Sequence, residues 1–250
     1  MDSAELYLAS VRKVLDEINL EQIAQAAELI AAALRHNGII QVFGAGHSSL
    51  LAQEIFFRAG GLVAVNPMLS SSLSFEGGVV ESTEFERRAE SAEGLIRAAD
   101  FHQNDVGIVI SNSGRNALPV EIAVRMKAVG MKVIALTNIA QSPQSNSHHS
   151  SGKRLFEIAD VILDNHCPPG DAAVTIKGIN AALGAVSTIA GAALLHAALL
   201  RAAELLAQEG TPPDSFVSVN LGSGSTDELK HLIAPYRQRI RYYRPNGGAN

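Results

Sequence analysis

Two turns rich in hydroxyl and amide side chains follow apolar segments of this 250-residue chain. The first follows residues 39–43 and reads Gly44, Ala45, Gly46, His47, Ser48 and Ser49. The second follows residues 106–110 and reads Ser111, Asn112, Ser113, Gly114, Arg115 and Asn116. Glycine lets the backbone approach an anion closely, and a helix starting there adds free N–H groups and a positive dipole end. The turns therefore predict donors for a phosphate group, with tight turns capped by serine and asparagine as the structural alternative.

The first turn does not match either of two nucleotide-binding motifs. A dinucleotide fingerprint needs a third glycine where Ser49 stands, and a P-loop needs Gly-Lys-Ser or Gly-Lys-Thr. The remaining interpretation is a phosphate held by neutral donors and helix N-termini.

The segments around these turns predict a parallel sheet covered by helices. Apolar runs without alternation, each followed by a helical pattern, are typical of parallel strands buried on both faces. We predict strands at residues 39–43, 62–65, 106–110, 132–137 and 161–164. Apolar spacing predicts two amphipathic helices, at residues 8–18 and 20–34, before the first strand. Later helices are predicted from residue 49 to about 60, at 83–99, at 117–130 and at 177–208.

The predicted elements form one doubly wound α/β domain over residues 1–250. It has N-terminal helices over 1–37, a sheet–helix core over 38–208 and a C-terminal tail over 209–250, in which residues 216–221 form an extra strand or an extended arm. Ligands of such sheets bind beyond the carboxyl ends of the strands, where both turns lie.

These motifs resemble the SIS (sugar isomerase) domain family. Its pattern is a strand with Gly-x-Gly-x-Ser, then a strand with Ser-x-Ser-Gly-x-Thr, a helix, a glycine and a strand ending in threonine. Gly130 and Thr137 take the last two places here. The resemblance covers residues 20–206 and implies a five-stranded sheet in flavodoxin-like order. It also implies a phosphosugar whose phosphate binds Gly46, Ser48, Ser49, Ser111, Ser113 and Asn116, the last standing where the family has threonine.

The chain most resembles a poorly characterised SIS subfamily labelled phosphosugar (phosphoheptose-type) isomerases. The segments that carry this likeness are Gly46-His47-Ser48, Arg58-Ala59-Gly60-Gly61, Ser151-Gly152-Lys153, Asp164-Asn165 and Gly170-Asp171-Ala172. The run Ser113-Gly114-Arg115 also resembles the N-acetylmuramic acid 6-phosphate etherases.

Aldose–ketose isomerisation needs a base near the sugar C1 and C2 and an acid for ring opening. SIS enzymes often supply a glutamate from the helix after the second strand, and Glu81, Glu84 and Glu86 lie there. We predict Glu86 and His149 as catalytic residues, and His47, Glu81, Glu84 and Arg115 as further site residues. Structural alternatives are a capping box of Thr83 with Glu86 and a solvated loop histidine at 149.

Other polar residues are assigned structural roles. We expect His196 to be a satisfied core histidine, and Glu54 and Arg58, one helical turn apart, to form an exposed ion pair. His166 and Cys167, with His148 or His149, could make a soft metal site, but no C-x-x-C or H-E-x-x-H spacing supports one. We therefore predict neither a metal nor a cofactor.

Composition limits the classes of partner. The net charge is −5 and there is no tryptophan, which argues against a nucleic-acid binder. A single cysteine excludes an internal disulfide and suits a reducing cytoplasm, which we predict as the location. Residues 181–200 carry no formal charge, but eight are alanine and Ser187 and Thr188 interrupt the run, so we expect a buried helix rather than a membrane span.

The predicted function is an aldose–ketose isomerase acting on a sugar phosphate by acid–base catalysis. The alternatives are a lyase or etherase on a phosphorylated amino sugar, and a sensor that binds a phosphosugar without chemistry. We expect no nucleic-acid or membrane partner, and a homo-oligomer, specifically a dimer with pockets near the interface. The reason is that the N-terminal helices and the 177–208 helix offer more apolar surface than one sheet needs.

Overall fold

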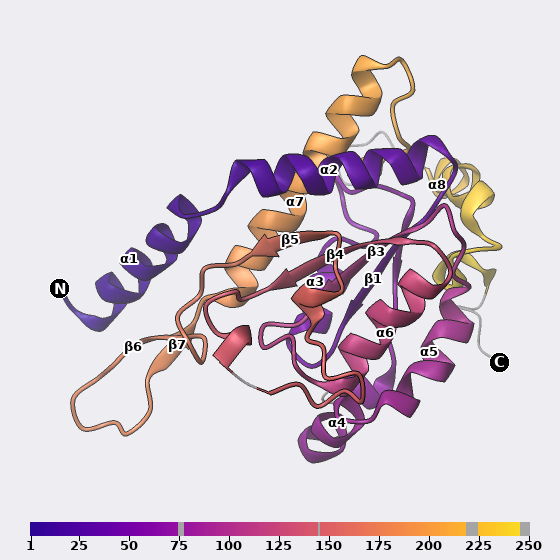
Figure 1. The fold of residues 1–250 in the computed structure, drawn as a ribbon. Coiled ribbons are helices and arrows are strands. Elements are labelled where there is room, and N and C mark those ends of the chain that lie inside the picture. The colour runs from indigo at the N-terminus through magenta and orange to yellow at the C-terminus, as the bar shows by residue number, and fades with distance from the viewer. Residues whose placement is uncertain (75–77, 145, 219–224, 246–250) are drawn as a thin grey trace.

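The computed structural model describes residues 1–74, 78–144, 146–218 and 225–245. Its centre is a five-stranded sheet in which every neighbouring pair is parallel (Figure 1). The order β2-β1-β3-β4-β5 confirms the predicted flavodoxin-like arrangement. The strands are β1 (Ile40–Gly44), β2 (Val65–Pro67), β3 (Val106–Ile110), β4 (Lys132–Thr137) and β5 (Val161–Asp164).

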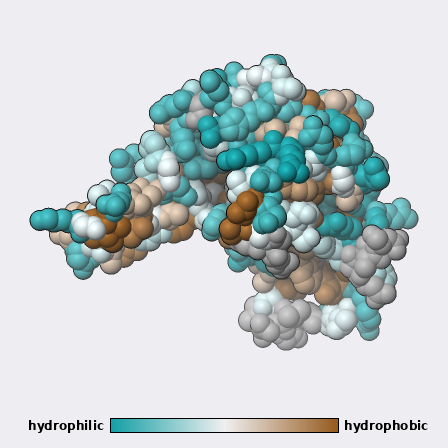
Figure 2. Space-filling model, turned by 90° about the horizontal axis from the view of Figure 1, so that it is seen from below, coloured by the Kyte–Doolittle hydropathy of each residue, from teal (hydrophilic) through white to brown (hydrophobic). Residues whose placement is uncertain are grey.

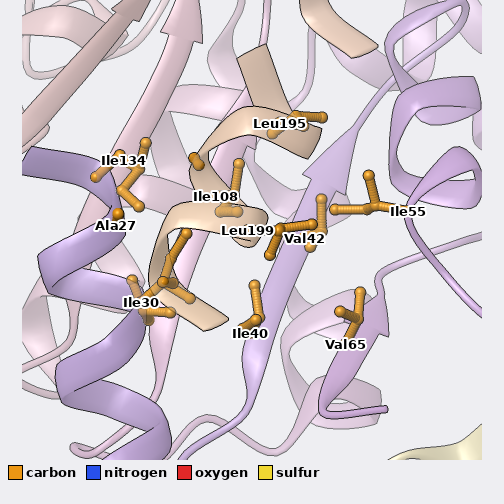
Figure 3. Close-up of a cluster of buried hydrophobic side chains, with 14 of the residues drawn as sticks. Ala27, Ile30, Ile40, Val42, Ile55, Val65, Ile108, Ile134, Leu195 and Leu199 are labelled. Atoms are coloured by element: carbon orange, nitrogen blue, oxygen red, sulfur yellow. The ribbon is translucent and has the colours of Figure 1, made fainter. Parts of the chain in front are cut away.

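Helices cover both faces of the sheet, as the non-alternating strands predict. One face carries α2 (Leu20–Arg35), α3 (Ser48–Glu54) and α7 (Ser187–Gln208). The other carries α4 (Val79–Glu86), α5 (Ala92–Ala99) and α6 (Ala117–Ala128). Figure 3 shows the first face, where Ile30, Val42 and Leu199 meet from helix and strand. Burying this apolar surface fixes how α3 and α7 lie beside each other.

The two predicted N-terminal helices are present as α1 (Ser3–Asp16) and α2. Asp2 and Glu5 form a capping box at the start of α1, and the side chain of Asn19 caps α2. The chain turns out of α2 at Asn37, which has a φ of +55°.

The long helix predicted over residues 177–208 begins ten residues later than expected. Before it, β6 (Ala172–Val174) and β7 (Leu183–Ala185) pair as an antiparallel hairpin. Gly178 and Gly184 have φ values of +90° and +80°, which no helix contains. The Asp171 carboxylate accepts from the Ser187 backbone N at 2.7 Å and caps α7 where it begins.

Other predicted boundaries are also wrong. The helix predicted over residues 83–99 is two helices, α4 and α5, joined by a short 3-10 turn. Thr83 lies inside α4, where its hydroxyl donates to the Val79 carbonyl, so the predicted capping box with Glu86 does not form. The first helix of the core ends at Glu54 rather than near residue 60, and β2 begins at Val65 rather than residue 62. Phe57, with a φ of +44°, turns the chain between them.

Two extensions leave the sheet–helix core. The arm, formed by α1 and the β6–β7 hairpin, projects to one side in Figures 1 and 2, and the Tyr7 hydroxyl joins its parts by donating to the Ala185 carbonyl. At the opposite side the tail forms α8 (Thr226–Ile233) and a 3-10 turn at Arg241–Tyr243. The predicted extra strand at residues 216–221 falls partly outside the described residues; residues 216–218 form none, although Phe216 is buried.

Among the described helices, α7 is the one whose length and hydropathy could cross a membrane. Its buried residues, which include Leu194, Leu195 and Leu199, recur on one face and pack in the core. The helix therefore serves as the core helix predicted for this apolar run.

Candidate functional site

The two predicted turns meet at the carboxyl edge of the sheet. Gly44 pairs in register with Ile110 on the neighbouring strand, and neighbouring strands lie about 4.8 Å apart. A Cβ on Gly44 would collide with the Ser48 carbonyl, so glycine is what lets the start of α3 fold back over β1. The turn after β1 and the turn after β3 therefore lie next to each other at this edge.

A small pocket lies at this meeting point, between the start of α3, the ends of β3 and β4, and the start of α7. Its polar lining is mostly neutral, and the Asn112 amide oxygen is held by the Asn165 amide at 2.7 Å. The lining residues are His47, Ser48, Leu51, Ile110, Asn112, Leu136, Asn165, Ser187 and Thr188. Neutral hydroxyls and amides of this kind suit the oxygens of a phosphate or of a sugar.

The turn after β3 is held in shape by its neighbours. Gly114 has a φ of +60°, and a Cβ there would lie 2.9 Å from the Ser142 hydroxyl. The Ser111 hydroxyl accepts from the Gly114 backbone N at 3.2 Å, which leaves its own proton for another acceptor. Asn116 precedes α6 without a side-chain capping bond, so its amide can also donate. Ser113 and Arg115 are half-buried in the same turn.

Beyond Ser48, α3 and α7 run side by side and form what we call the seam. Ser48 and Thr188 line the pocket at its start, Leu51 lies against Gly191 in its middle, and Glu54 meets His196 further along. With a rise of 1.5 Å per residue, Glu54 lies about 9 Å from Ser48 along the axis of α3. The seam thus connects neutral donors at one end to titratable groups at the other.

Three titratable side chains meet at the far end of the seam. Arg58 donates to Glu54 Oε1, while His196 Nε2 lies 3.3 Å from Glu54 Oε1 and 3.4 Å from Arg58 Nη1. The side chains of His196 and Glu54 are 34% and 42% exposed, so solutes can reach both. Burial lowers the pKa of the His196 imidazole, and the positive charge of Arg58 lowers it further. The ring is therefore neutral at neutral pH and can exchange a proton.

This cluster differs from what the sequence predicts. Glu54 and Arg58 form the expected ion pair, but His196 is a partner of that pair rather than a satisfied core histidine. The spacing of Glu54 and Arg58 is visible in the sequence. Their contact with a residue more than 130 positions away has no local signal.

The predicted catalytic histidine lies in a different environment. His149 is 8% exposed, its Nε2 lies 2.8 Å from Glu121 Oε2, and its Nδ1 lies 2.8 Å from the Ser151 hydroxyl. The His148 backbone N donates to the Arg115 carbonyl beside it. These bonds hold the loop after β4 against the start of α6, and we call Glu121, His149 and Ser151 the clamp.

The predicted glutamates all lie on α4. Glu86 is half-buried at its end, Glu84 pairs with Arg88 at 3.1 Å, and Glu81 is exposed in its first turn. Within the described residues no hydrogen bond or ion pair joins Glu86 to His149. The structure thus brings the two glycine- and serine-rich turns together, whereas Glu86 and His149, the two predicted acid–base residues, share no described hydrogen bond or ion pair.

Cys167, considered from the sequence as a ligand of a soft metal site, is a neutral thiol. Cys167 is 2% exposed, and burial together with the charges of Asp171 and Asp164 raises its pKa to about 12. His166 Nδ1 lies 3.5 Å from Asp164. In the described ranges no three histidine, cysteine, aspartate or glutamate side chains group as metal ligands would.

A larger cavity, of about 630 Å³, lies at the amino edge of the sheet, beside Gly38 and Ala64. Its arginines are already paired, Arg35 with Glu209 and Arg239 with Asp105, and its Asp214 carboxylate accepts from the Tyr236 hydroxyl at 3.0 Å. Because sheets of this type bind ligands at the carboxyl edge, we assign the site to the seam and its pocket.

Comparison with known proteins agrees with the motifs. The family model of the SIS domain matches residues 6–138. The chain is 37% identical over 220 residues to a UPF0309 protein of Geobacillus thermodenitrificans, with 88% of each chain covered. It is 41% identical over 225 residues to the UPF0309 protein in the nagA 3′ region of Lysinibacillus sphaericus, covering 90% of this chain and 91% of that relative.

Solved structures share the fold at low identity. A phosphoheptose isomerase from Francisella tularensis matches with a TM-score of 0.51 and 18% identity, over 81% of this chain and 98% of that one. A candidate phosphosugar isomerase involved in capsule formation from Bacteroides fragilis matches with a TM-score of 0.53 and 17% identity, over 92% and 95%. At these identities the likeness extends to the fold alone.

Proposed function

This chain belongs to the SIS domain family, a family of phosphosugar-binding domains, and from that premise we propose that it isomerises a sugar phosphate between its aldose and ketose forms. The observation that carries the proposal is the seam, which joins a pocket of neutral donors to an accessible carboxylate–imidazole pair. Neutral donors bind a phosphosugar, and a carboxylate with an imidazole can move its protons.

In the proposed complex, the two turns bind the phosphate. Ser48 approaches from α3, while Ser111, Ser113 and Asn116 approach from the turn before α6. Gly46 lets the backbone approach the phosphate closely. The Ser49 hydroxyl holds that turn by donating to the Gly46 carbonyl at 2.7 Å. His47 and Arg115 flank these donors.

In the proposed reaction, the sugar lies over the exposed side of the seam, past the packed Leu51–Gly191 contact, and reaches Glu54. A base removes the proton from the carbon next to the carbonyl while an acid protonates the carbonyl oxygen, which gives an enediol. The enediol then loses the proton of its other hydroxyl, whose oxygen becomes the new carbonyl, and takes up a proton at the former carbonyl carbon. Glu54 suits the base, and the neutral His196 suits the group that gives and takes the oxygen-bound proton. This is acid–base chemistry throughout, so the proposal includes no metal and no cofactor.

The test is a panel of aldose and ketose phosphates, screened for thermal stabilisation and then incubated in D2O. Isomerisation through an enediol places deuterium from the solvent at C1 or C2, which proton NMR detects. Stabilisation without deuterium uptake or product would overturn the isomerase in favour of a sensor. Loss of a substituent at C3 would identify the lyase or etherase alternative instead.

Glu86 and His149 remain the acid–base residues predicted from sequence, and separate variants test them. Glu86→Gln supports the assignment if turnover falls about 100-fold or more while sugar-phosphate affinity is kept. Full turnover in that variant would leave the seam as the acid–base site. Glu90→Gln serves as the matched control, since Glu90 is exposed just beyond the same helix and is not a predicted site residue.

We also propose that the chain forms a homodimer through the arm and acts in the cytoplasm. The arm exposes Leu6, Leu8, Ile179 and Leu183, of which Leu8 is 50% exposed (Figure 2). Exposed apolar groups gathered on one extension are typical of an interface. Sedimentation should show a dimer at micromolar concentration, and Leu8→Asp with Leu183→Asp should shift it to monomer. A wild-type monomer would contradict the proposal.

A further inference from the structure

We propose a second anion site, separate from the seam, in which Arg241 of the C-terminal tail binds a carboxylate or phosphate group of a small polar molecule. Two adjoining cavities, of about 290 and 330 Å³, share Leu69, Ser70, Ser71 and Arg241 in their linings. None of the residues that line them also lines the Ser48 pocket.

The chemistry of the lining favours an anion. Hydroxyls and an amide are contributed by Ser49, Ser70, Ser71, Ser74, Ser91 and Gln53, and an apolar wall by Leu69, Leu73, Phe85 and Leu95. Among the described residues that line the two cavities, Arg241 is the one charged side chain, and no described carboxylate forms an ion pair with it. A cation among hydroxyls, with no described carboxylate paired to it, provides the groups that bind carboxylate or phosphate.

Arg241 is held in place before any ligand arrives. Its Nη2 donates to the Leu69 carbonyl at 2.5 Å and contacts the Tyr242 hydroxyl, and its guanidinium lies 4.6 Å from the Tyr242 ring centroid. The 3-10 turn that carries it is anchored by the Tyr243 hydroxyl, which donates to the Val63 carbonyl at 2.9 Å. These contacts use one guanidinium nitrogen, so Nε and Nη1 can still donate to an anion.

The position of the site connects it to the phosphate turn. Ser48 lines the seam pocket and Ser49 lines the Arg241 site, so the start of α3 separates the two. Gly44 also lines the Arg241 site. A ligand there would therefore contact the same turn that binds the sugar phosphate.

Counting bound inorganic phosphate by isothermal titration calorimetry tests the proposal. The wild type should bind two phosphates per chain, and the Ser48→Ala/Ser113→Ala variant should keep the one at Arg241. Arg241→Gln should weaken that second event about tenfold or more, because a charge-assisted bond is lost. Arg244→Gln is the matched control, since Arg244 lies in the same tail and its bonds within the described part of the chain go to backbone carbonyls.

Gluconate, with sorbitol as its uncharged counterpart, distinguishes a carboxylate from a phosphate ligand. Gluconate binding that Arg241→Gln removes identifies a carboxylate, and a second phosphate without gluconate binding identifies a phosphate ester. Ser71→Asp places a carboxylate in the cavity and should block either anion without altering Arg241. Equal binding by Arg241→Gln and Arg244→Gln, or one phosphate event removed entirely by the serine variant, would overturn the site. Neither the phosphate titration nor the gluconate titration requires sugar turnover, so failure of this site is distinguishable from failure of the proposed isomerase.

Discussion

The seam and the clamp both pair a histidine with a glutamate, yet they differ in access. In the seam, His196 and Glu54 are 34% and 42% exposed and share their contact with Arg58. In the clamp, the side chains of His149 and Glu121 are 5% and 21% exposed, and both ring nitrogens of His149 already have partners. A proton-transfer group must reach its substrate to about 3 Å, so the same two residue types suit chemistry in one place and loop anchoring in the other.

The largest expected difference between the two regions is in turnover. Glu54→Gln should lower kcat on the sugar phosphate by about 10²- to 10⁴-fold, because the amide cannot accept the proton. Glu121→Gln, the matched change in the clamp, should leave kcat within severalfold of the wild type. Steady-state kinetics on both variants would contradict the assignment if Glu121→Gln lost more turnover than Glu54→Gln.

The reverse order is expected for stability. His149→Ala removes the bonds of the ring to Glu121 and Ser151 and leaves the partly buried Glu121 with Arg125, at 3.5 Å, as its partner, which should cost about 1–3 kcal/mol. His196→Ala should cost less, because its ring is more exposed and its contacts are longer. Urea denaturation measures both variants, and an equal loss of free energy of unfolding would remove the distinction.

A smaller difference is expected in binding. Ser48→Ala should weaken sugar-phosphate affinity about tenfold or more through loss of a hydrogen bond to a charged group. Ser151→Ala, which affects the clamp, should leave affinity unchanged even if it loosens the loop. Calorimetric titration with the best ligand of the panel compares them, and weaker binding in Ser151→Ala alone would place the phosphate on the α6 side of the loop.

The smallest effect concerns pH. His196 is neutral above its lowered pKa. The midpoint of the acid limb in the pH profile of kcat/KM should therefore lie below pH 6.5, the ordinary pKa of an imidazole. Arg58→Gln removes a positive charge and should move that limb to higher pH, whereas Arg125→Gln, beside Glu121 in the clamp, should not move it. Because the unfolded chain binds this proton more readily, stability should also decrease as pH falls through 6.5. An unchanged acid limb in Arg58→Gln would contradict the coupling.

Much of the fold is predictable from local pattern. The strands at residues 106–110, 132–137 and 161–164 form with the predicted bounds, because continuous apolar runs between turn residues can be buried only in a sheet covered on both faces. One boundary that failed, the start of α7, lies where a contact distant in sequence decides it. Asp171 starts α7 at Ser187, although the alanine-rich pattern extends further back.

The candidate site also combines features set by local sequence with features set by contacts distant in sequence. The sequence by itself determined the two glycine- and serine-rich turns, because these residue types at helix starts act through their own backbone and need only neighbouring strands to bring the turns together. Tertiary structure alone decided that His196 joins Glu54, that His149 is locked by Glu121, and that Arg241 faces the serines after β2. These partners lie between 28 and 171 positions apart, beyond the reach of helix or strand periodicity. Only the packing of helices and tail on the sheet brings such side chains within bonding distance.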